Sequence, residues 1–282
     1  MGAGSVRVEA TGSASAGVAT ILIENPGKRN AISSGMWAQF APLLEGLAAD
    51  PAVKVLVVRG AGFDFSAGAD IADLDAILGR VERSSAILGD GPVDGGRADG
   101  LTDGGVMTEA ENALAAFPKP TIAAIDGYCV GGGWELAGAC DLRICSDRST
   151  FGITPSRLGI VYPRSGLERV VAIAGPAVAK HLLFTGELVT ADVAFGWGLV
   201  TKVLPDVGFW DAAYEFADLL ASRSQYSIRA MKELVDAIAA GRGDVGAIVD
   251  RWLAAASDDR EIGVDAFRAK RPPRFTWGSG VQ

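Results

Sequence analysis

Cysteine and histidine are scarce in this sequence. Three cysteines (Cys129, Cys140 and Cys145) and one histidine (His181) occur among 282 residues. No two cysteines are spaced as a C-x-x-C pair, and all three lie in apolar segments. We therefore expect reduced, buried thiols, and neither a disulfide framework nor a metal site. A serine–histidine catalytic triad built on the single histidine also lacks support.

An excess of positive charge and a long apolar run are missing as well. Lysine and arginine number 26 against 34 aspartates and glutamates, which gives a net charge of −8. Such a chain is a poor candidate for binding nucleic acid or an anionic membrane. No apolar run reaches the roughly 18 residues that a membrane span needs. Met1–Ser15 is small and polar without the pattern of a signal peptide, so we expect a flexible lead and a cytoplasmic protein.

Apolar strands alternate with helical segments in the first half of the chain. Residues 18–23, 54–59 and 121–126 are apolar runs with β-branched residues, which predicts buried strands. Helices are expected at about 33–48 and 106–117. Strands that alternate with helices in this way predict βαβ units with a parallel sheet.

Composition divides the chain into a core, a loop and a helical end. Residues 79–105 hold many glycines and aspartates and little periodicity, which is typical of a long mobile loop. From Gly175 onwards the pattern is mostly helical. Helices of the C-terminal region are expected near 209–222, 227–240, 245–255 and 259–270. We therefore expect a core over residues 1–205, interrupted by the loop, and a helical region over 206–282.

Two glycine-rich turns carry the clearest functional signal. Phe65-Ser-Ala-Gly-Ala-Asp70 and Gly127-Tyr-Cys-Val-Gly-Gly-Gly-Trp-Glu-Leu-Ala137 each follow a predicted strand and precede a helix. In a parallel sheet both turns lie at the carboxyl ends of strands, where ligands bind. Glycine lets a ligand approach the backbone, and the first N–H groups of a helix have no partner within it. One N–H from each turn can thus bind a single carbonyl oxygen as an oxyanion hole, although either turn alone is also typical of a purely structural connection.

These turns and several other segments resemble the crotonase superfamily of enoyl-CoA hydratases and isomerases. The other matching segments are Asn25–Ala31, Cys140–Arg143, Phe151-Gly152, Leu183–Glu187, Ala194–Val200 and Arg260–Arg271. All occur in order over roughly residues 5–276, which makes the match specific. The resemblance implies an α/β spiral of βαβ turns with a helical C-terminal region that assembles trimers or dimers of trimers. It also implies an acyl-CoA thioester as the substrate, with no cofactor besides that CoA.

The resemblance further implies which residues are catalytic. The backbone N–H groups of Ala69 and Gly132 would bind the thioester oxygen as it gains charge in an enolate. Glu135 falls on one of the two catalytic glutamates of hydratases. The structural alternative for Glu135 is that it only stabilises the positive end of a helix.

Two basic residues are expected near the CoA phosphates. Lys28 and Arg29 lie on the loop that runs beside these phosphates in the family, and both side chains suit that role. Ordinary solvated charges are the alternative. The other residues that the resemblance places at the CoA channel are Asn30, Ala31, Ala67, Gly68 and Asp70.

The sequence departs from the family at the second catalytic glutamate. Hydratases read Phe-Gly-x-Pro-Glu there, whereas Phe151-Gly-Ile-Thr-Pro155 places a proline at the glutamate position. Proline cannot transfer a proton. Tyr162 falls near the acyl end of the expected pocket. Its hydroxyl can position a carboxylate or a water there, or it can simply bond to the backbone.

Hydration of a 2-enoyl-CoA in fatty-acid or related metabolism is the function that we predict, with Glu135 transferring protons. Three alternatives stay open. The single glutamate can isomerise an enoyl-CoA. The same scaffold can also catalyse decarboxylation or thioester hydrolysis, with Tyr162 or Arg164 recognising a carboxylate. The last alternative is a CoA-binding subunit without activity.

Overall fold

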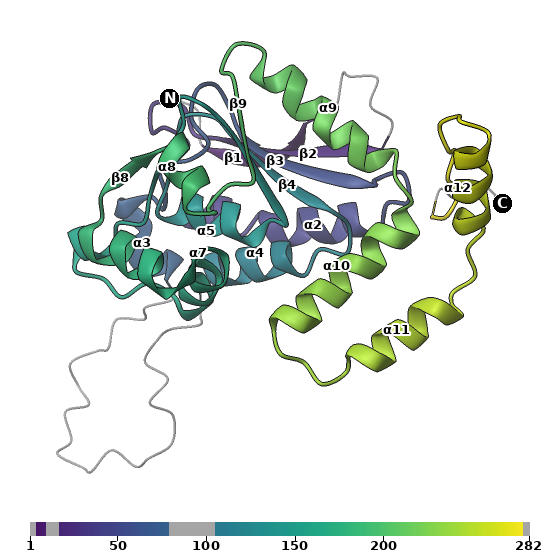
Figure 1. Cartoon of the computed structure of the whole chain (residues 1–282). Coiled ribbons are helices and arrows are strands. Elements are labelled where there is room, and N and C mark those ends of the chain that lie inside the picture. The colour runs from purple at the N-terminus through teal and green to yellow at the C-terminus, as the bar shows by residue number, and fades with distance from the viewer. Residues whose placement is uncertain (1–3, 10–16, 79–104, 279–282) are drawn as a thin grey trace.

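A six-stranded sheet runs through the centre of the computed structural model, which describes residues 4–9, 17–78 and 105–278 (Figure 1). Its strands are β1 (Ser5–Glu9), β2 (Val18–Glu24), β3 (Val55–Gly60), β4 (Thr121–Ile125), β6 (Leu142–Ser146) and β9 (Lys202–Leu204). They lie in the order β1-β2-β3-β4-β6-β9. Every neighbouring pair is parallel except β1 and β2. The carboxyl ends of the parallel strands therefore meet at one edge, as predicted.

The first strand was not predicted from the sequence. Ser5–Glu9 pairs antiparallel with β2, with Ser5 opposite Glu24. Val6 is buried, and its N–H donates to Oε1 of Gln39 (2.7 Å). The alternation of polar and apolar residues in Ser-Val-Arg-Val-Glu is the period of a half-buried strand, and it was the available signal.

Both faces of the sheet are covered by helices. Val55 and Val57 of β3 pack toward α9 (Phe209–Ala221), whereas Leu56 and Val58 join the larger core on the opposite face. The helices on that opposite face include α2 (Phe40–Ala49), α4 (Val106–Ala115) and α5 (Gly132–Ala139) (Figure 1). A strand that is buried on both sides reads as a continuous apolar run, which is how β3 was recognised.

A smaller sheet lies beside the large one. It consists of β5 (Tyr128–Val130), β7 (Thr150–Gly152) and β8 (Leu188–Thr190) in the order β5-β7-β8. Short helical segments complete this part of the fold: α1 (Ser34–Trp37), a 3-10 turn (Ile71–Asp73), α3 (Leu74–Ile77), α6 (Pro155–Leu158) and α8 (Ala191–Gly196).

Helix α7 (Arg164–Thr185) is longer than the sequence predicted. The sequence predicted mostly helical structure only from Gly175 onwards, next to Pro176. That proline begins only the second half, because Gly175 adopts φ 77° and ψ 165° and kinks the helix there. The first half carries residues that contact the site described below.

Three further helices form the C-terminal end: α10 (Gln225–Ala239), α11 (Val245–Ala254) and α12 (Asp259–Arg268). All lie close to their predicted ranges and extend to one side of the sheet (Figure 1). They expose large apolar side chains, and Phe267 is 85% exposed. The other large apolar side chains exposed on these helices are Met231, Val235, Ile238, Val249, Leu253 and Val264.

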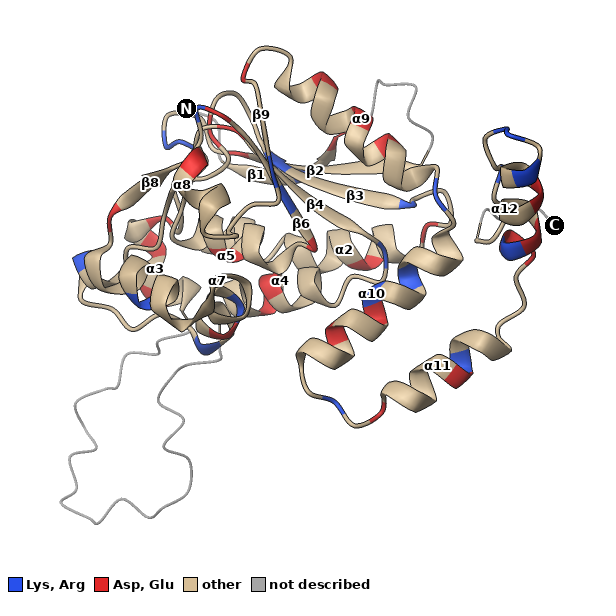
Figure 2. Ribbon diagram, viewed as in Figure 1, with Lys and Arg blue, Asp and Glu red and all other residues tan. Residues whose placement is uncertain are grey.

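Charge is distributed unevenly over the elements. Figure 2 shows acidic side chains and no basic ones on α9, while Lys and Arg are spread over several elements of the sheet body and the C-terminal helices. The three cysteines are buried and free, as predicted. In the described part of the chain, no helix is long and apolar enough to cross a membrane. The predicted loop at 79–105 lies almost entirely outside the described residues.

Candidate active site

The two glycine-rich turns lie side by side. The N–H of Ser66 donates to the carbonyl of Tyr128 (2.8 Å), and the N–H of Val130 donates to the carbonyl of Ser66 (3.0 Å). The loop that follows β3 is thereby fixed to strand β5, which leads into α5. The N–H of Ile32 also donates to the carbonyl of Gly68 (2.8 Å), so a third segment supports the same loop.

Ala69 and Gly132 meet through their backbones. A Cβ atom on Gly132 would lie 3.1 Å from the nitrogen of Ala69, which is tighter than ordinary van der Waals contact, so a side chain at position 132 would push the two turns apart. Gly131, at φ 53° and ψ −117°, turns the chain into α5 and leaves Gly132 as the first helical residue. Among the described residues, neither the N–H of Ala69 nor that of Gly132 has a backbone acceptor. Both N–H groups can therefore donate a hydrogen bond to an oxygen of a bound ligand.

Both donors border a cavity of about 330 Å³. The predicted site residues that line it are Ala67, Gly68, Ala69, Gly132, Glu135 and Tyr162. Apolar side chains make up much of the remaining wall, among them Ile71, Leu74, Met107, Leu158, Ile160 and Leu188. Pro155 is buried and lines the cavity too, so the position where hydratases have their second glutamate faces the site without an acid.

Glu135 is a buried carboxyl inside this cavity. Its side chain comes from the first turn of α5 and is 1% exposed. Neither carboxyl oxygen has a hydrogen-bond partner in the part of the chain that the structure describes. Burial, and next the nearby charge of Glu111, raise the pKa of Glu135 well above the 4.5 of an exposed glutamate. Glu135 therefore keeps its proton to a higher pH than an exposed glutamate does.

Glu111 is a second buried acid, which our sequence analysis missed. It lies on α4, is fully buried, forms an ion pair with Arg169, and accepts a hydrogen bond from Oγ of Ser165 (3.3 Å). A signal was present, because Glu111 follows Met107 by four residues and precedes Leu114 by three. A glutamate within the apolar stripe of a helix indicates a buried charge that needs a partner.

Tyr162 lies beside Glu135. Its hydroxyl donates to the carbonyl of Gly131 (3.1 Å), which is the backbone bond that the structural alternative predicts. Burial raises the pKa of Tyr162 well above 10, so the phenol stays neutral. A Cβ atom on Gly166 would lie 2.6 Å from Oε1 of Glu135 and 2.7 Å from Cε1 of Tyr162. Both side chains therefore pack against this glycine of α7.

The loop that carries Lys28 and Arg29, called the basic loop below, lies next to the cavity, and neither of these residues lines it. The carbonyl of Arg29 accepts from the N–H of Ala67 (2.9 Å), and its guanidinium lies 4.8 Å from the centre of the Tyr128 ring, which does line the cavity. Nζ of Lys28 bonds to Oδ2 of Asp70 (2.6 Å). The carbonyl of Lys28 also accepts from the N–H of Ala31 (2.9 Å). Lys28 and Arg29 are exposed and available to a ligand that extends from the cavity.

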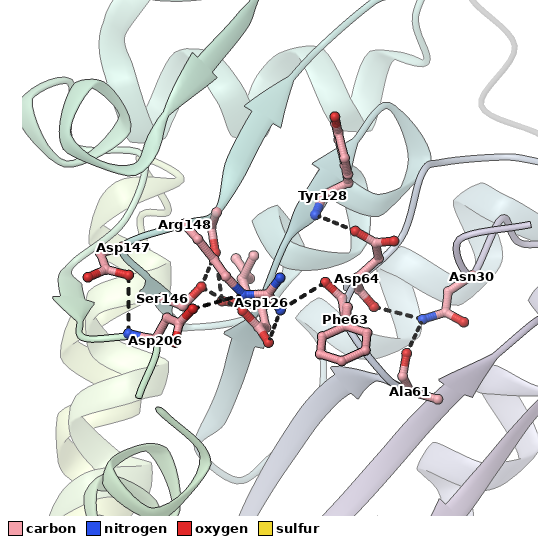
Figure 3. Close-up of polar contacts among 12 residues, drawn as sticks. Asn30, Ala61, Phe63, Asp64, Asp126, Tyr128, Ser146, Asp147, Arg148 and Asp206 are labelled. Carbon is pink, nitrogen blue, oxygen red and sulfur yellow. Dashed lines mark hydrogen bonds and ion pairs between the residues drawn. The ribbon is translucent and has the colours of Figure 1, made fainter. Parts of the chain in front are cut away.

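A network of polar contacts links the two turns to neighbouring segments of the chain (Figure 3). Oδ1 of Asp64 accepts from the N–H of Tyr128 (3.0 Å), while the carbonyl of Asp64 accepts from Nδ2 of Asn30 (2.7 Å). Arg148 joins the carboxylate of Asp126 to the carbonyl of Phe63. Asn30, which the resemblance placed at the CoA channel, is buried and ties the basic loop to the turn after β3.

Two other side chains considered from the sequence lie away from the cavity. His181 is on the exposed side of α7, where its ring bonds to Glu187. Arg164 is exposed and pairs with Glu168 (2.8 Å). Neither lines the cavity.

The sequence profile of the enoyl-CoA hydratase/isomerase family matches residues 13–85 and 98–278. The chain belongs to this family. It is 33% identical over 284 residues to human enoyl-CoA hydratase domain-containing protein 2, mitochondrial, covering 97% of this chain and 90% of that protein. It is 30% identical over 261 residues to 2,3-dehydroadipyl-CoA hydratase of Escherichia coli, covering 92% and 94%. A crystal structure of an enoyl-CoA hydratase/isomerase family member superposes with a TM-score of 0.84 at 37% identity, covering 98% of both chains.

Membership in the enoyl-CoA hydratase/isomerase family confirms the crotonase resemblance and the predicted fold, a mixed α/β core with a helical C-terminal region. It also makes the chain an acyl-CoA-processing enzyme of hydratase/isomerase type. The roles of individual residues rest on the geometry described above.

Proposed function

We propose that this enzyme adds water across the double bond of a 2-enoyl-CoA thioester. The observation that carries the proposal is Glu135, a buried carboxyl without a hydrogen-bond partner in the same cavity as the free N–H groups of Ala69 and Gly132. A thioester oxygen bound to the two N–H groups gains negative charge when water attacks Cβ, and both donors stabilise that charge. Glu135 is the acid that supplies the proton for Cα.

One carboxyl group can balance the whole reaction. The water oxygen bonds to Cβ, the carbon–carbon double bond becomes an enolate, and the proton of Glu135 passes to Cα. The proton that the water loses returns to the carboxyl, so Glu135 ends as it began. No second acid at position 155 and no cofactor besides the CoA of the substrate enters this scheme.

The protonation of Glu135 favours hydration over isomerisation. An isomerase that uses one glutamate begins by removing a proton from carbon, which requires the carboxylate form. The raised pKa of Glu135 disfavours that form in the free enzyme. The rate of hydration should therefore fall as Glu135 loses its proton at high pH, whereas the rate of isomerisation should rise over the same range.

Binding of the CoA part and assembly complete the proposal. Lys28 and Arg29 are proposed to meet the phosphates, with Ala31, Ala67, Gly68 and Asp70 along the channel. The exposed apolar side chains of α10–α12 suit contacts between subunits, and we propose a homotrimer or a dimer of trimers built through residues 206–282. Helix α9 of that region also covers the large sheet. A cytoplasmic location stays a prediction from the sequence.

The decisive experiment is a substrate panel with wild type and Glu135→Gln. Crotonyl-CoA should be hydrated by wild type, and the variant should lose about 100-fold or more in kcat. CoA binding, measured by calorimetry, should be unchanged in the variant. Faster turnover of a 3-enoyl-CoA than of crotonyl-CoA would favour the isomerase, and unchanged hydration by Glu135→Gln would exclude the proposed mechanism.

One observation favours an acyl chain that ends in a carboxylate. Arg157 is exposed and lines the otherwise mainly apolar cavity, and no acidic side chain pairs with it among the described residues. A cation at the edge of an apolar pocket can bind a terminal carboxylate. One relative is named for such a substrate, 2,3-dehydroadipyl-CoA. Arg157 would then have the role that the sequence analysis considered for Arg164.

A further inference from the structure

Glu111 and Glu135 pack against adjacent residues of α7. Oγ of Ser165 donates to Glu111, and the next residue, Gly166, lies against Oε1 of Glu135. Glu111 is fully buried and does not line the cavity, whereas Glu135 does. The two carboxyls therefore form one buried pair, with Glu135 on the substrate side.

The two members of the pair have different partners. Arg169 of α7 forms an ion pair with Glu111 and also donates to Oδ1 of Asn112 (2.6 Å). The polar groups that act on Glu135 are Glu111 from α4, and Tyr162 and Arg169 from α7 and the segment before it. Of these, Tyr162 directs its hydroxyl to a backbone carbonyl. Arg169 and Ser165 thus bond directly to the carboxylate of Glu111, whereas neither carboxyl oxygen of Glu135 has a hydrogen-bond partner among the described residues.

Two neighbouring buried carboxyls do not both ionise at neutral pH, because each charge disfavours the other. The member that is paired with a cation keeps the charge, and the member that faces an apolar cavity keeps the proton. We propose that Glu111, held by Arg169 and Ser165, is a positioning residue that keeps the proton on Glu135. This inference rests on the proposed role of Glu135 as the acid of the site. Glu111 acts through the charge that Arg169 stabilises and does not line the cavity, so it takes no part in proton transfer.

The position of this pair explains how the site works without a glutamate at position 155. In a site with two catalytic carboxyls, one can hold the proton while the other is charged. Here Glu135 is the only acid among the described residues that line the cavity, and Glu111 lies outside the cavity on α4. The Glu111–Arg169 pair therefore supplies the fixed charge without occupying the space of the substrate.

Infrared difference spectroscopy tests the proposal without substrate. The carbonyl band of a protonated carboxyl, assigned to Glu135 by its absence in Glu135→Gln, should disappear with rising pH at a measurable midpoint. Glu111→Gln should lower that midpoint by about one pH unit or more, because the like charge is gone. Glu111→Asp keeps the charge and should restore most of the shift. Glu109→Gln, a change at an exposed position of the same helix, should leave the midpoint unchanged.

An unchanged midpoint in Glu111→Gln, or the absence of any band that depends on Glu135, would overturn the proposal. If Glu111→Gln alone fails to fold, the double variant Glu111→Gln/Arg169→Gln leaves neither charge buried alone. Its midpoint should also lie below that of wild type, because Glu111 affects Glu135 more strongly than Arg169 does. The test separates the two proposals. If Glu111→Gln shifts the midpoint but the wild-type enzyme does not hydrate crotonyl-CoA, the positioning role of Glu111 stands and only the proposed hydration reaction is wrong.

Discussion

The backbone nitrogen of Ala69 lies so close to Gly132 that a Cβ atom on the glycine would be only 3.1 Å from it. The same Cβ would lie 3.0 Å from Cζ2 of the buried Trp37. Neither neighbour can easily yield, because one is backbone and the other is a core side chain. The spacing of the two N–H donors is therefore fixed by the absence of a side chain at position 132.

Gly132→Ala should separate the donors and lower kcat/KM by about 100-fold, a typical effect of losing one oxyanion-hole donor. Steady-state kinetics with crotonyl-CoA provides the measurement. Gly138→Ala is a matched control in the same helix, because its Cβ would meet its nearest atom, Nε1 of Trp134, at an ordinary 3.8 Å. Similar kinetics for both variants would rule out the proposed oxyanion hole.

Stability should depend on pH through Glu135. Its pKa in the folded chain is raised above the unfolded value of about 4.5, so the folded state binds the proton more tightly. This contribution to stability is complete below the unfolded pKa and is lost as pH rises toward the folded pKa, at about 1.4 kcal/mol per pH unit. Glu135→Gln should therefore become progressively more stable than wild type as pH rises from 5 upward, as measured by urea unfolding on both proteins. If the unfolding free energies of the two proteins changed in parallel with pH, burial would not raise the pKa of Glu135.

Most of the fold could be predicted from the sequence, because strands such as β3 are buried on both faces and appear as apolar runs. The kinked α7 could not, since its first half mixes exposed, buried and charged residues around Gly166 without a clear period. The close approach of the two glycine-rich turns could be predicted because their glycines allow it, and the binding of a substrate oxygen by Ala69 and Gly132 stays a prediction. The sequence marks Glu111 as a charge within an apolar helix stripe, but its partner Arg169, 58 residues away in sequence, is brought to it only by the fold.

Tyr162→Phe should separate the two interpretations of this tyrosine. Its hydroxyl donates to the carbonyl of Gly131, which also accepts from the N–H of Glu135 (3.1 Å), so that carbonyl keeps one partner in the variant. We expect a loss of about 1 kcal/mol in the free energy of unfolding and a decrease of less than about tenfold in kcat. A loss of kcat as large as that of Glu135→Gln would instead make the phenol a direct participant in proton transfer.

Arg157 should determine the preference for the end of the acyl chain. Arg157→Met keeps an unbranched aliphatic side chain beside the apolar wall and removes the charge, so KM for a dicarboxyl enoyl-CoA should rise about 10-fold, in line with a lost charge-assisted hydrogen bond. KM for crotonyl-CoA, which has no terminal carboxylate, should stay the same or fall. Equal effects on both substrates would assign Arg157 to packing, since its side chain also lies against Gly186.

Lys28 should act on the phosphates of CoA and on nothing closer to the reaction. Its ammonium is exposed and already bonded to Asp70, so phosphate binding shares or replaces an existing ion pair. The net effect of Lys28→Met on KM for crotonyl-CoA should therefore be modest, about two- to fivefold, and should shrink at high salt. Asp70→Asn frees the ammonium and should change KM in the opposite direction. A crotonyl thioester of N-acetylcysteamine lacks the phosphates, so its KM should be the same for wild type and Lys28→Met; a matching rise with both thioesters would place Lys28 in the support of the turn at Ala69 instead.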